Sequence, residues 1–418
     1  MRLSKNNFGF LNDSMWSRVL VVSLIFFFVC LSDAILSDWI PSYMQTALGS
    51  SLIMGLVFSF SSVIGFLSDL IIPQLLRGFK SRKLILLGIG VSLVFSGVLL
   101  WTTSWPWILL FLVAMAVWGV YYELLGFGSS QFVSDAVPLR SRSGVWATIG
   151  VFRCLAYFIG PILGSWLAIS KGNSVVPVVA AASVCVGYLI WLLTNKREKD
   201  FEKTIIPMEK FNIREELGYW KVLFEHVWPV LAISMMMGLI DATYWTTGAV
   251  LSDNLAKNGL FGILFLPLYM LPPVFLGVVL TKWGVYKGKK KMAEAFLLLS
   301  GVLLLCLGFG GNLFIMLLLS FLIGASLSVS APMTDAVYSD ILARMGKEKK
   351  HMVGLSSSML NIAYIIGPIM AGFIAGMVGE RMTFAVVGGV TVVVAIVLLI
   401  VTPKKLRLPQ AEIAEWKD

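Results

Sequence analysis

Charged residues are scarce in this chain of 418 residues, at 13%, whereas hydrophobic residues make up 58%. Soluble globular domains carry about 25% charged residues, so the deficit excludes an ordinary soluble fold. Apolar runs of about 20 residues, long enough to cross a bilayer, recur along the whole sequence. The predicted membrane helices cover residues 18–42, 50–72, 84–102, 105–134, 144–169, 175–195, 226–252, 258–281, 292–309, 312–338, 353–376 and 382–402. The sequence therefore predicts an all-α membrane protein with twelve transmembrane helices.

Histidine and cysteine are also rare, with two and four residues. All four cysteines fall inside predicted spans, which favours apolar packing over a disulfide framework. His226 and His351 lie at predicted helix ends, with no cysteine or carboxylate at metal-ligand spacing. We therefore expect no metal site. An intramembrane enzyme is disfavoured, because it would need a nucleophile with a base or a metal cluster.

The net charge of +10 follows the predicted topology. Of the 33 Lys and Arg residues, 29 lie in the termini and in alternate loops, and the other loops hold only Lys171, Lys257 and Arg381. The positive-inside rule then places both termini in the cytoplasm of a protein of the plasma (inner) membrane. The basic balance gives no reason to expect a nucleic-acid partner.

Three short phrases occur twice at nearly the same offset. YFIGPILGSW (157–166) recurs as YIIGPIMAGF (364–373), SDAV (134–137) recurs as TDAV (334–337), and Asp33 is followed 208 positions later by Asp241. Such a repeat predicts two six-helix halves in the same orientation. We expect an N-terminal bundle at 1–195, a linker at 196–225 and a C-terminal bundle with a short tail at 226–418. The linker pattern predicts a short interfacial helix after Asn212.

The chain resembles the major facilitator superfamily of secondary transporters over residues 18–402. The resemblance is carried by Gly65-x-x-x-Asp69 with the basic cluster that follows it, by Asp135-x-x-Pro138-x-x-x-Arg142, and by the repeat itself. It implies two pseudo-symmetric halves that transport by alternating access, with a gating role for the motif residues. Those residues are Gly65, Asp69, Arg77, Arg82, Lys83, Asp135 and Arg142.

The repeated Gly-Pro phrase is similar to a helix 5 motif of the superfamily's antiporters. It places Gly160, Pro161 and Gly164 in the first half and Gly367 and Pro368 in the second. Small residues let neighbouring helices approach closely, and those neighbours can satisfy the backbone groups that proline frees. The phrase therefore indicates close helix packing, a contact suited to rocking helices, or both.

Away from the helix ends, five charged residues lie within the predicted spans, where charges normally face an interior cavity: Asp33, Asp38, Glu123, Arg153 and Asp241. Asp33 and Asp241 would lie at equal depth, either as proton carriers or as protonated groups hydrogen-bonded across helices. Glu123 and Arg153 lie on consecutive helices and are expected to form an ion pair, either static or switching. Asp38 lies nearer the outer end and is expected to be a solvated residue at the mouth.

Aromatic and polar residues near these charges are the substrate-binding candidates: Asp38, Trp39, Tyr121, Tyr122, Tyr157, Tyr244, Trp245, Asn361 and Tyr364. Aromatic faces with carboxylates can hold a lipophilic cation, and the same residues can stack on a sugar. We expect a monomeric transporter that binds a small-molecule substrate within the lipid bilayer, uses no cofactor and is driven by the proton gradient, with export of lipophilic cations favoured. Proton-coupled uptake of a sugar or other small nutrient is the alternative, and an intramembrane enzyme or a non-transporting sensor is a remote one.

Overall fold

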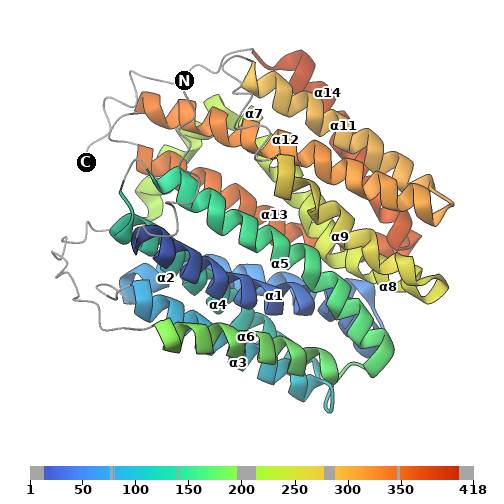
Figure 1. Ribbon diagram of the computed structural model, residues 1–418. Helices are drawn as coiled ribbons and strands as arrows, with labels where there is room; N and C mark the ends of the chain where they lie inside the picture. Colours follow the sequence, from blue (N-terminus) through green and yellow to red (C-terminus); the bar gives the residue numbers. More distant parts are fainter. Residues whose placement is uncertain are drawn as a thin grey trace, which may run out of the picture. The chain divides into compact units, whose positions relative to one another are not determined.

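The computed structural model describes residues 14–75, 79, 81–138, 141–194, 213–276, 288–345 and 349–403. Within those ranges the structure is helical and contains no strand (Figure 1). Eleven of the described helices are long and apolar enough to cross a membrane, and Leu260–Leu276 forms a shorter apolar helical segment. The prediction of an all-α membrane fold is confirmed.

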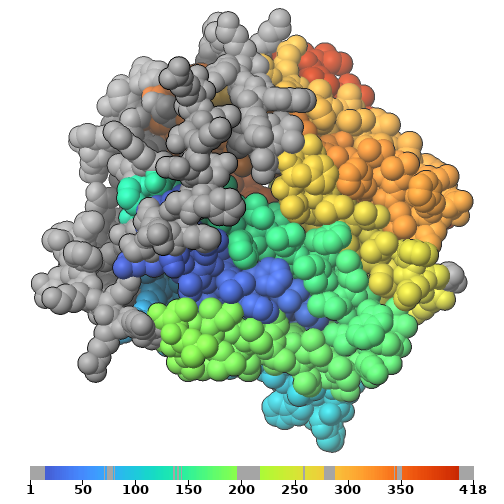
Figure 2. All heavy atoms as spheres, in the orientation of Figure 1, coloured from blue at the N-terminus to red at the C-terminus, as the bar shows by residue number. Residues whose placement is uncertain are grey.

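The first of two compact units comprises Met1–Tyr43 and Val63–Ile205. Its helices are α1 (Ser14–Leu48) as far as Tyr43, the later part of α2 (Ser51–Leu75), α3 (Ser81–Thr102), α4 (Ile108–Ala136), α5 (Arg142–Lys171) and α6 (Val175–Thr194). Within this unit α3 packs against both α4 and α6 (Figure 1). The α3–α4 connection, cyan in Figure 2, carries the exposed side chains of Trp105 and Trp107, and Trp101 at the end of α3 is exposed as well.

The second unit comprises Met44–Ser62 and Ile206–Asp418. Its described helices after residue 206 begin with α7 (Ile213–Thr243), a π-helical turn (Tyr244–Gly248), α8 (Ala249–Asn258), a 3-10 turn (Leu260–Leu264) and α9 (Phe265–Met270). They continue with α11 (Lys289–Phe309), α12 (Leu313–Met345), α13 (Lys349–Val378) and α14 (Glu380–Val401). In this unit α11 packs against α12 and α14, and α13 packs against α7.

The boundary between the halves differs from the expected one. Residues from Ile213 onward are the first turns of α7, so the predicted interfacial helix is not a separate element. Leu223 is fully buried in a cluster that also receives Trp220. Packing against α12 and α13 therefore extends α7 beyond its apolar span. The expected cap Asn212 lies outside the described residues.

The eighth apolar span contains three prolines and is distorted. A 3-10 turn at Leu260–Leu264 leads into the six-residue α9, and the chain bends at Leu271 before Pro272 and Pro273. Proline lacks a backbone donor and clashes with the preceding turn, which explains the broken helix.

The Gly-Pro phrase brings two helices into close contact in each unit. A Cβ atom added to Gly160 of α5 would lie 2.3 Å from the Cβ of Ala34 in α1, and one added to Gly367 of α13 would lie 2.5 Å from the Cβ of Ala242 in α7. Ala34 and Ala242 are themselves equivalent in the repeat. In each unit the phrase therefore allows the same close contact between two helices, which confirms the packing interpretation. Its use in rocking stays a prediction.

One buried ion pair was not anticipated. Lys290 and Glu294 lie one turn apart at the start of α11, with Nζ 2.8 Å from Oε1, and both side chains are almost fully buried. Lys290 also donates to Thr402 Oγ1 and, at 3.0 Å, to the Pro403 carbonyl oxygen. The lysine satisfies one carbonyl group just beyond the end of α14 and brings its positive charge to the negative dipole end of that helix.

Candidate functional site

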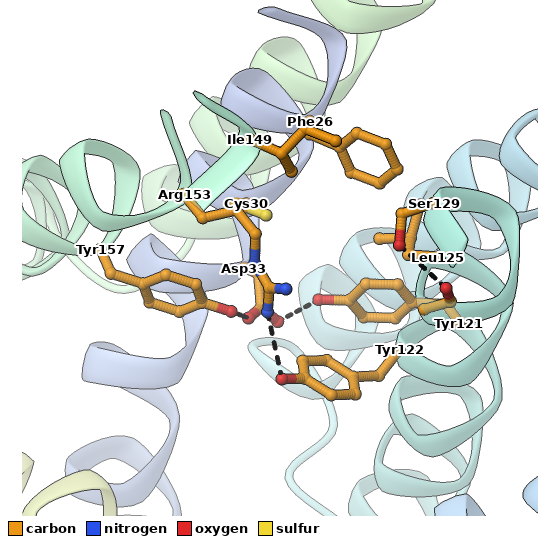
Figure 3. A pocket seen from close by; sticks show the side chains of 11 residues that line it. Phe26, Cys30, Asp33, Tyr121, Tyr122, Leu125, Ser129, Ile149, Arg153 and Tyr157 are labelled. Atoms are coloured by element: carbon orange, nitrogen blue, oxygen red, sulfur yellow. Dashed lines mark hydrogen bonds between the residues drawn. The ribbon is translucent and has the colours of Figure 1, made fainter. Parts of the chain in front are cut away.

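Asp33 of α1 is the centre of a hydrogen-bonded cluster in the first unit (Figure 3). Trp118 Nε1 donates to Asp33 Oδ1 over 2.7 Å, and the Tyr121 hydroxyl donates to the same oxygen. The Tyr157 hydroxyl of α5 donates to Oδ2. Asp33 is only 4% exposed, so these donors replace the water that a carboxyl group would otherwise bind.

Arg153 supplies the positive charge in this first-unit pocket. It lies one turn before Tyr157 on α5, and its Nη2 atom is 3.5 Å from the Tyr122 hydroxyl (Figure 3). The cavity has a volume of about 100 Å³. Its lining comprises Phe26, Cys30, Asp33, Tyr121, Tyr122, Leu125, Gly126, Ser129, Ile149, Arg153 and Tyr157. A space of this size admits a few water molecules, but it is well below the roughly 300–1,000 Å³ typical of drug-sized ligand sites.

The expected ion pair between Glu123 and Arg153 is not formed. The Glu123 carboxyl group is hydrogen-bonded to Asp69 of α2, and a Cβ added to Gly65 would lie 3.4 Å from Glu123 Oε1. Successive residues of a helix are rotated by about 100°. Because Tyr121 faces Asp33, Glu123 points to the far side of α4, toward α2. The prediction of a Glu123–Arg153 ion pair was therefore wrong, because the two side chains lie on different sides of α4.

Asp241 of α7 has an equivalent environment in the second unit. The Tyr364 hydroxyl of α13 donates to Asp241 Oδ2, and the Tyr269 hydroxyl of α9 donates to Oδ1 over 2.8 Å. Tyr157 and Tyr364 are the first residues of the two Gly-Pro phrases. The close packing of α5 on α1 and of α13 on α7 therefore places one tyrosine hydroxyl against one aspartate carboxyl group in each unit.

The cavity beside Asp241 is much larger, with a volume of about 570 Å³. Its lining contains two carboxylates, three tyrosines, two methionines and no lysine, arginine or histidine. The lining residues are Ser234, Met237, Gly238, Asp241, Tyr269, Met270, Pro273, Gly324, Leu327, Ser328, Ala331, Pro332, Asp335, Tyr338, Ser356, Ser357, Leu360 and Tyr364. This size and this mixture of apolar and acidic groups suit an organic cation.

Two substrate-binding candidates in the first unit are buried elsewhere. Asp38 is 3% exposed and accepts a hydrogen bond from Ser165 of α5 at 2.7 Å, so it is not the solvated mouth residue that its position suggested. Trp39 is 2% exposed, stacks on Tyr43 with ring centroids 4.6 Å apart, and donates to Asn173. Neither residue lines the Asp33 pocket.

Three candidates in the second unit do not line the large cavity either: Tyr244, Trp245 and Asn361. Tyr244 is fully buried and stacks on Tyr269, with ring centroids 3.8 Å apart, beside Phe384. It and Trp245 begin the π-helical turn that follows α7. The wider turn changes the helical phase just after Asp241, so residues expected on the cavity face turn into the core.

The expected gating residues occupy several environments. Arg142 donates to the Ser134 carbonyl oxygen at 2.7 Å and the Val137 carbonyl oxygen at 3.2 Å, and so caps the end of α4. The Arg82 guanidinium lies 5.3 Å from the centroid of the Trp191 ring of α6, and Lys83 lies 5.7 Å from that of Phe79. Arg77 and the side chain of Asp135 lie outside the described residues.

Three residues of the candidate site were not predicted from the sequence: Trp118, Tyr269 and Asp335. Trp118 lies three residues before Tyr121, and residues at that spacing share a helix face, so this one was recognisable. Tyr269 lies in the proline-broken segment, where helical phase gives no guide. Asp335 repeats Asp135, but Tyr338 stands where the first half has Pro138, and α12 therefore runs on to Met345.

The described residues contain no group of three or more His, Cys, Asp or Glu side chains that could hold a metal ion. The polar side chains that line the two pockets carry carboxyl groups, tyrosine and serine hydroxyls, one thiol and one guanidinium.

Comparisons with known proteins agree on one family. The sequence pattern of the Major Facilitator Superfamily matches residues 3–161 and 238–418. The chain is 26% identical over 403 residues to the multidrug resistance protein MdtG of Citrobacter koseri, which covers 91% of this chain and 94% of the relative. It is 26% identical over 185 residues to a Na⁺, Li⁺, K⁺/H⁺ antiporter of Planococcus maritimus, covering 43% of each chain.

A solved structure supports the fold. A bacterial homologue of the human drug peptide transporters PepT1 and PepT2 superimposes with a TM-score of 0.73 at 15% identity, covering 96% of this chain and 100% of that one. At this identity the likeness concerns the fold alone.

Proposed function

Since the chain belongs to the Major Facilitator Superfamily, it is a multi-pass membrane transporter rather than an enzyme, and we propose that it is a proton-coupled exporter of lipophilic cations. Asp33 carries the proton, and the large cavity of the second unit receives the substrate.

The difference between the two cavities carries this proposal. The repeat supplies each unit with an aspartate held by tyrosines, yet the cavity beside Asp33 measures about 100 Å³ and the one beside Asp241 about 570 Å³. A proton or a water molecule fits the first space, whereas only the second has room for a drug-sized molecule. The two equivalent aspartates therefore have different roles: Asp33 binds the proton, and Asp241 contributes negative charge to the substrate cavity. Asp241 remains a second candidate for proton binding.

The charges favour a cation over other substrate classes. The cavity lining of the second unit carries Asp241 and Asp335 and no basic side chain, and its tyrosine and methionine side chains offer polarisable surface. The Citrobacter relative is named a multidrug resistance protein, and this name supports a drug-like substrate. The distribution of Lys and Arg supports cytoplasmic termini in the inner membrane. We expect the working unit to be a monomer.

Gradient-driven transport in proteoliposomes tests the proposal. Purified wild type, Asp33→Asn and Asp340→Asn proteins are reconstituted, a pH gradient is imposed, and movement of the fluorescent cation ethidium is followed. Asp340 is a matched control, because it is a half-exposed carboxylate paired with Lys289 and lines neither pocket. We expect wild type and Asp340→Asn to concentrate ethidium against its gradient. Asp33→Asn should lose concentrative transport while still exchanging ethidium across the membrane.

Two outcomes would overturn parts of this proposal. Concentrative transport that survives in Asp33→Asn, with the same dependence on the pH gradient, would exclude Asp33 as the proton carrier. Wild-type liposomes that move no ethidium would reject the cation class and shift attention to uptake of a sugar or another small nutrient.

A further inference from the structure

Asp335 is the one carboxylate of the second-unit cavity whose charge the described residues leave uncompensated. Both oxygens of Asp241 accept hydrogen bonds from tyrosine hydroxyls. Asp335 is exposed, and no donor or cation among the described residues contacts its carboxylate. Lys289, which lies near this part of α12, is engaged with Asp340, with Nζ 2.8 Å from Oδ2.

The position of Asp335 along the cavity follows from Tyr338. The Tyr338 hydroxyl is 2.8 Å from Ser234 Oγ and 3.2 Å from the Val230 carbonyl oxygen of α7. Asp241 lies seven residues after Ser234, and Asp335 lies three residues before Tyr338 in the antiparallel α12. At 1.5 Å per residue, Asp335 is roughly 5–10 Å nearer the start of α7 than Asp241. The cavity therefore presents two negative groups at different depths, one on α7 and one on α12.

This arrangement arose by divergence between the two halves. In the first half Pro138 follows the SDAV phrase, and α4 ends at Ala136. In the second half Tyr338 takes the place of that proline, and α12 continues to Met345. The helix therefore carries Asp335 along the cavity wall instead of ending beside it.

We propose that Asp335 is a specificity-determining residue that binds the second positive charge of dicationic amphiphiles, whose aromatic body lies among Tyr269, Tyr338 and Tyr364. This inference rests on the proposed function in that the cavity must bind cations. It adds that the transporter prefers dications to monocations of the same shape. A single positive charge engages one end of the cavity, whereas two charges a few ångströms apart engage both.

Ethidium and propidium provide the test. The two dyes share a fluorescent phenanthridinium ring, and propidium carries an additional quaternary ammonium group on a short arm. Equilibrium binding of each dye is measured by fluorescence anisotropy on detergent-purified wild type, Asp335→Asn, Asp335→Glu and the control Asp340→Asn. We expect the wild type and Asp340→Asn to bind propidium about three- to tenfold more tightly than ethidium. Asp335→Asn should bring the two affinities within about twofold, because propidium loses more affinity than ethidium, and Asp335→Glu should keep the preference.

Each alternative result counts against the inference. A propidium preference that persists in Asp335→Asn, a wild type without any preference, or an equal loss of both dyes in Asp335→Asn would overturn it. Measurable ethidium binding and monodisperse elution show that the variant is folded. Because no gradient is present, loss of proton coupling in liposomes leaves these measurements unaffected, so the two proposals can fail separately.

Discussion

At the residue scale, the two central aspartates could be predicted from the sequence, but their hydrogen-bond partners could not. Asp33 and Asp241 were recognisable because a charge inside an apolar span is costly and because the two occur at the same place in the repeat. Tyr157 and Tyr364 were expected to bind substrate, yet they donate to these aspartates. Which hydroxyl meets which carboxyl group depends on the rotation of packed helices, and the sequence of α1, which is apolar on all sides, does not define that rotation.

The role of Tyr157 as a positioning residue is testable by Tyr157→Phe. Loss of a hydrogen bond to a buried acid should cost about 1–3 kcal/mol, because the Asp33 oxygen then lacks a partner. We expect the maximal rate of ethidium transport to fall by roughly fivefold or more, with KM changing less than about twofold, since the Asp33 pocket is too small for the dye. Tyr188→Phe is the control, because Tyr188 stacks on Trp191 of α6 and lies outside both pockets. A change confined to KM would instead make Tyr157 a substrate contact.

At the element scale, helix phase and helix length decide what the sequence could predict. Glu123 and Arg153 lie on consecutive helices at similar depth, but Glu123 is two positions from Tyr121 and therefore faces α2. The π-helical turn at Tyr244–Gly248 has the same consequence after Asp241. The Gly-Pro contacts were predictable because small residues at fixed spacing specify close approach without any knowledge of rotation.

The close contact between α5 and α1 is testable with two glycines of one helix. The methyl group of Gly160→Ala would lie 2.3 Å from the Ala34 Cβ, whereas nothing lies within 4 Å of a Cβ added at Gly150. Overpacking typically costs about 1–3 kcal/mol. We expect Gly160→Ala to lower the midpoint of thermal unfolding and the transport rate together, because α5 moves away and separates Tyr157 from Asp33. Gly150→Ala should match or slightly exceed wild-type stability. Equal behaviour of the two variants would show that the contact is not restrictive.

At the scale of the whole molecule, duplication explains both what the halves share and where they differ. The aspartate, the tyrosine and the Gly-Pro contact recur, because they form the scaffold of each unit. The cavities diverged through residues that the repeat does not preserve, such as Arg153 in the first unit and Tyr338 in the second. Cavity volume results from the packing of many side chains, so the sequence predicted two equivalent sites where the structure has two unequal ones.

The orientation of the chain in the membrane decides which end of the second-unit cavity faces the cytoplasm. The Lys and Arg distribution predicts that the α3–α4 connection is external and that the start of α7 is cytoplasmic. Ser104 of that connection and Gly218 of α7 are both exposed, so cysteine at either position should be tolerated. A membrane-impermeant maleimide applied to intact cells should label Ser104→Cys, but should label Gly218→Cys only after permeabilisation, with the wild-type protein reporting labelling of native cysteines.

The outcome of this labelling bears directly on Asp335. It lies nearer the start of α7 than Asp241 does, so labelling of the predicted kind places the uncompensated carboxylate on the cytoplasmic side of the cavity. A dication arriving from the cytoplasm would then meet Asp335 first and Asp241 afterwards, which is the order that an exporter requires. The reverse labelling pattern would place Asp335 on the external side and favour uptake, while leaving the dye-binding preference itself intact.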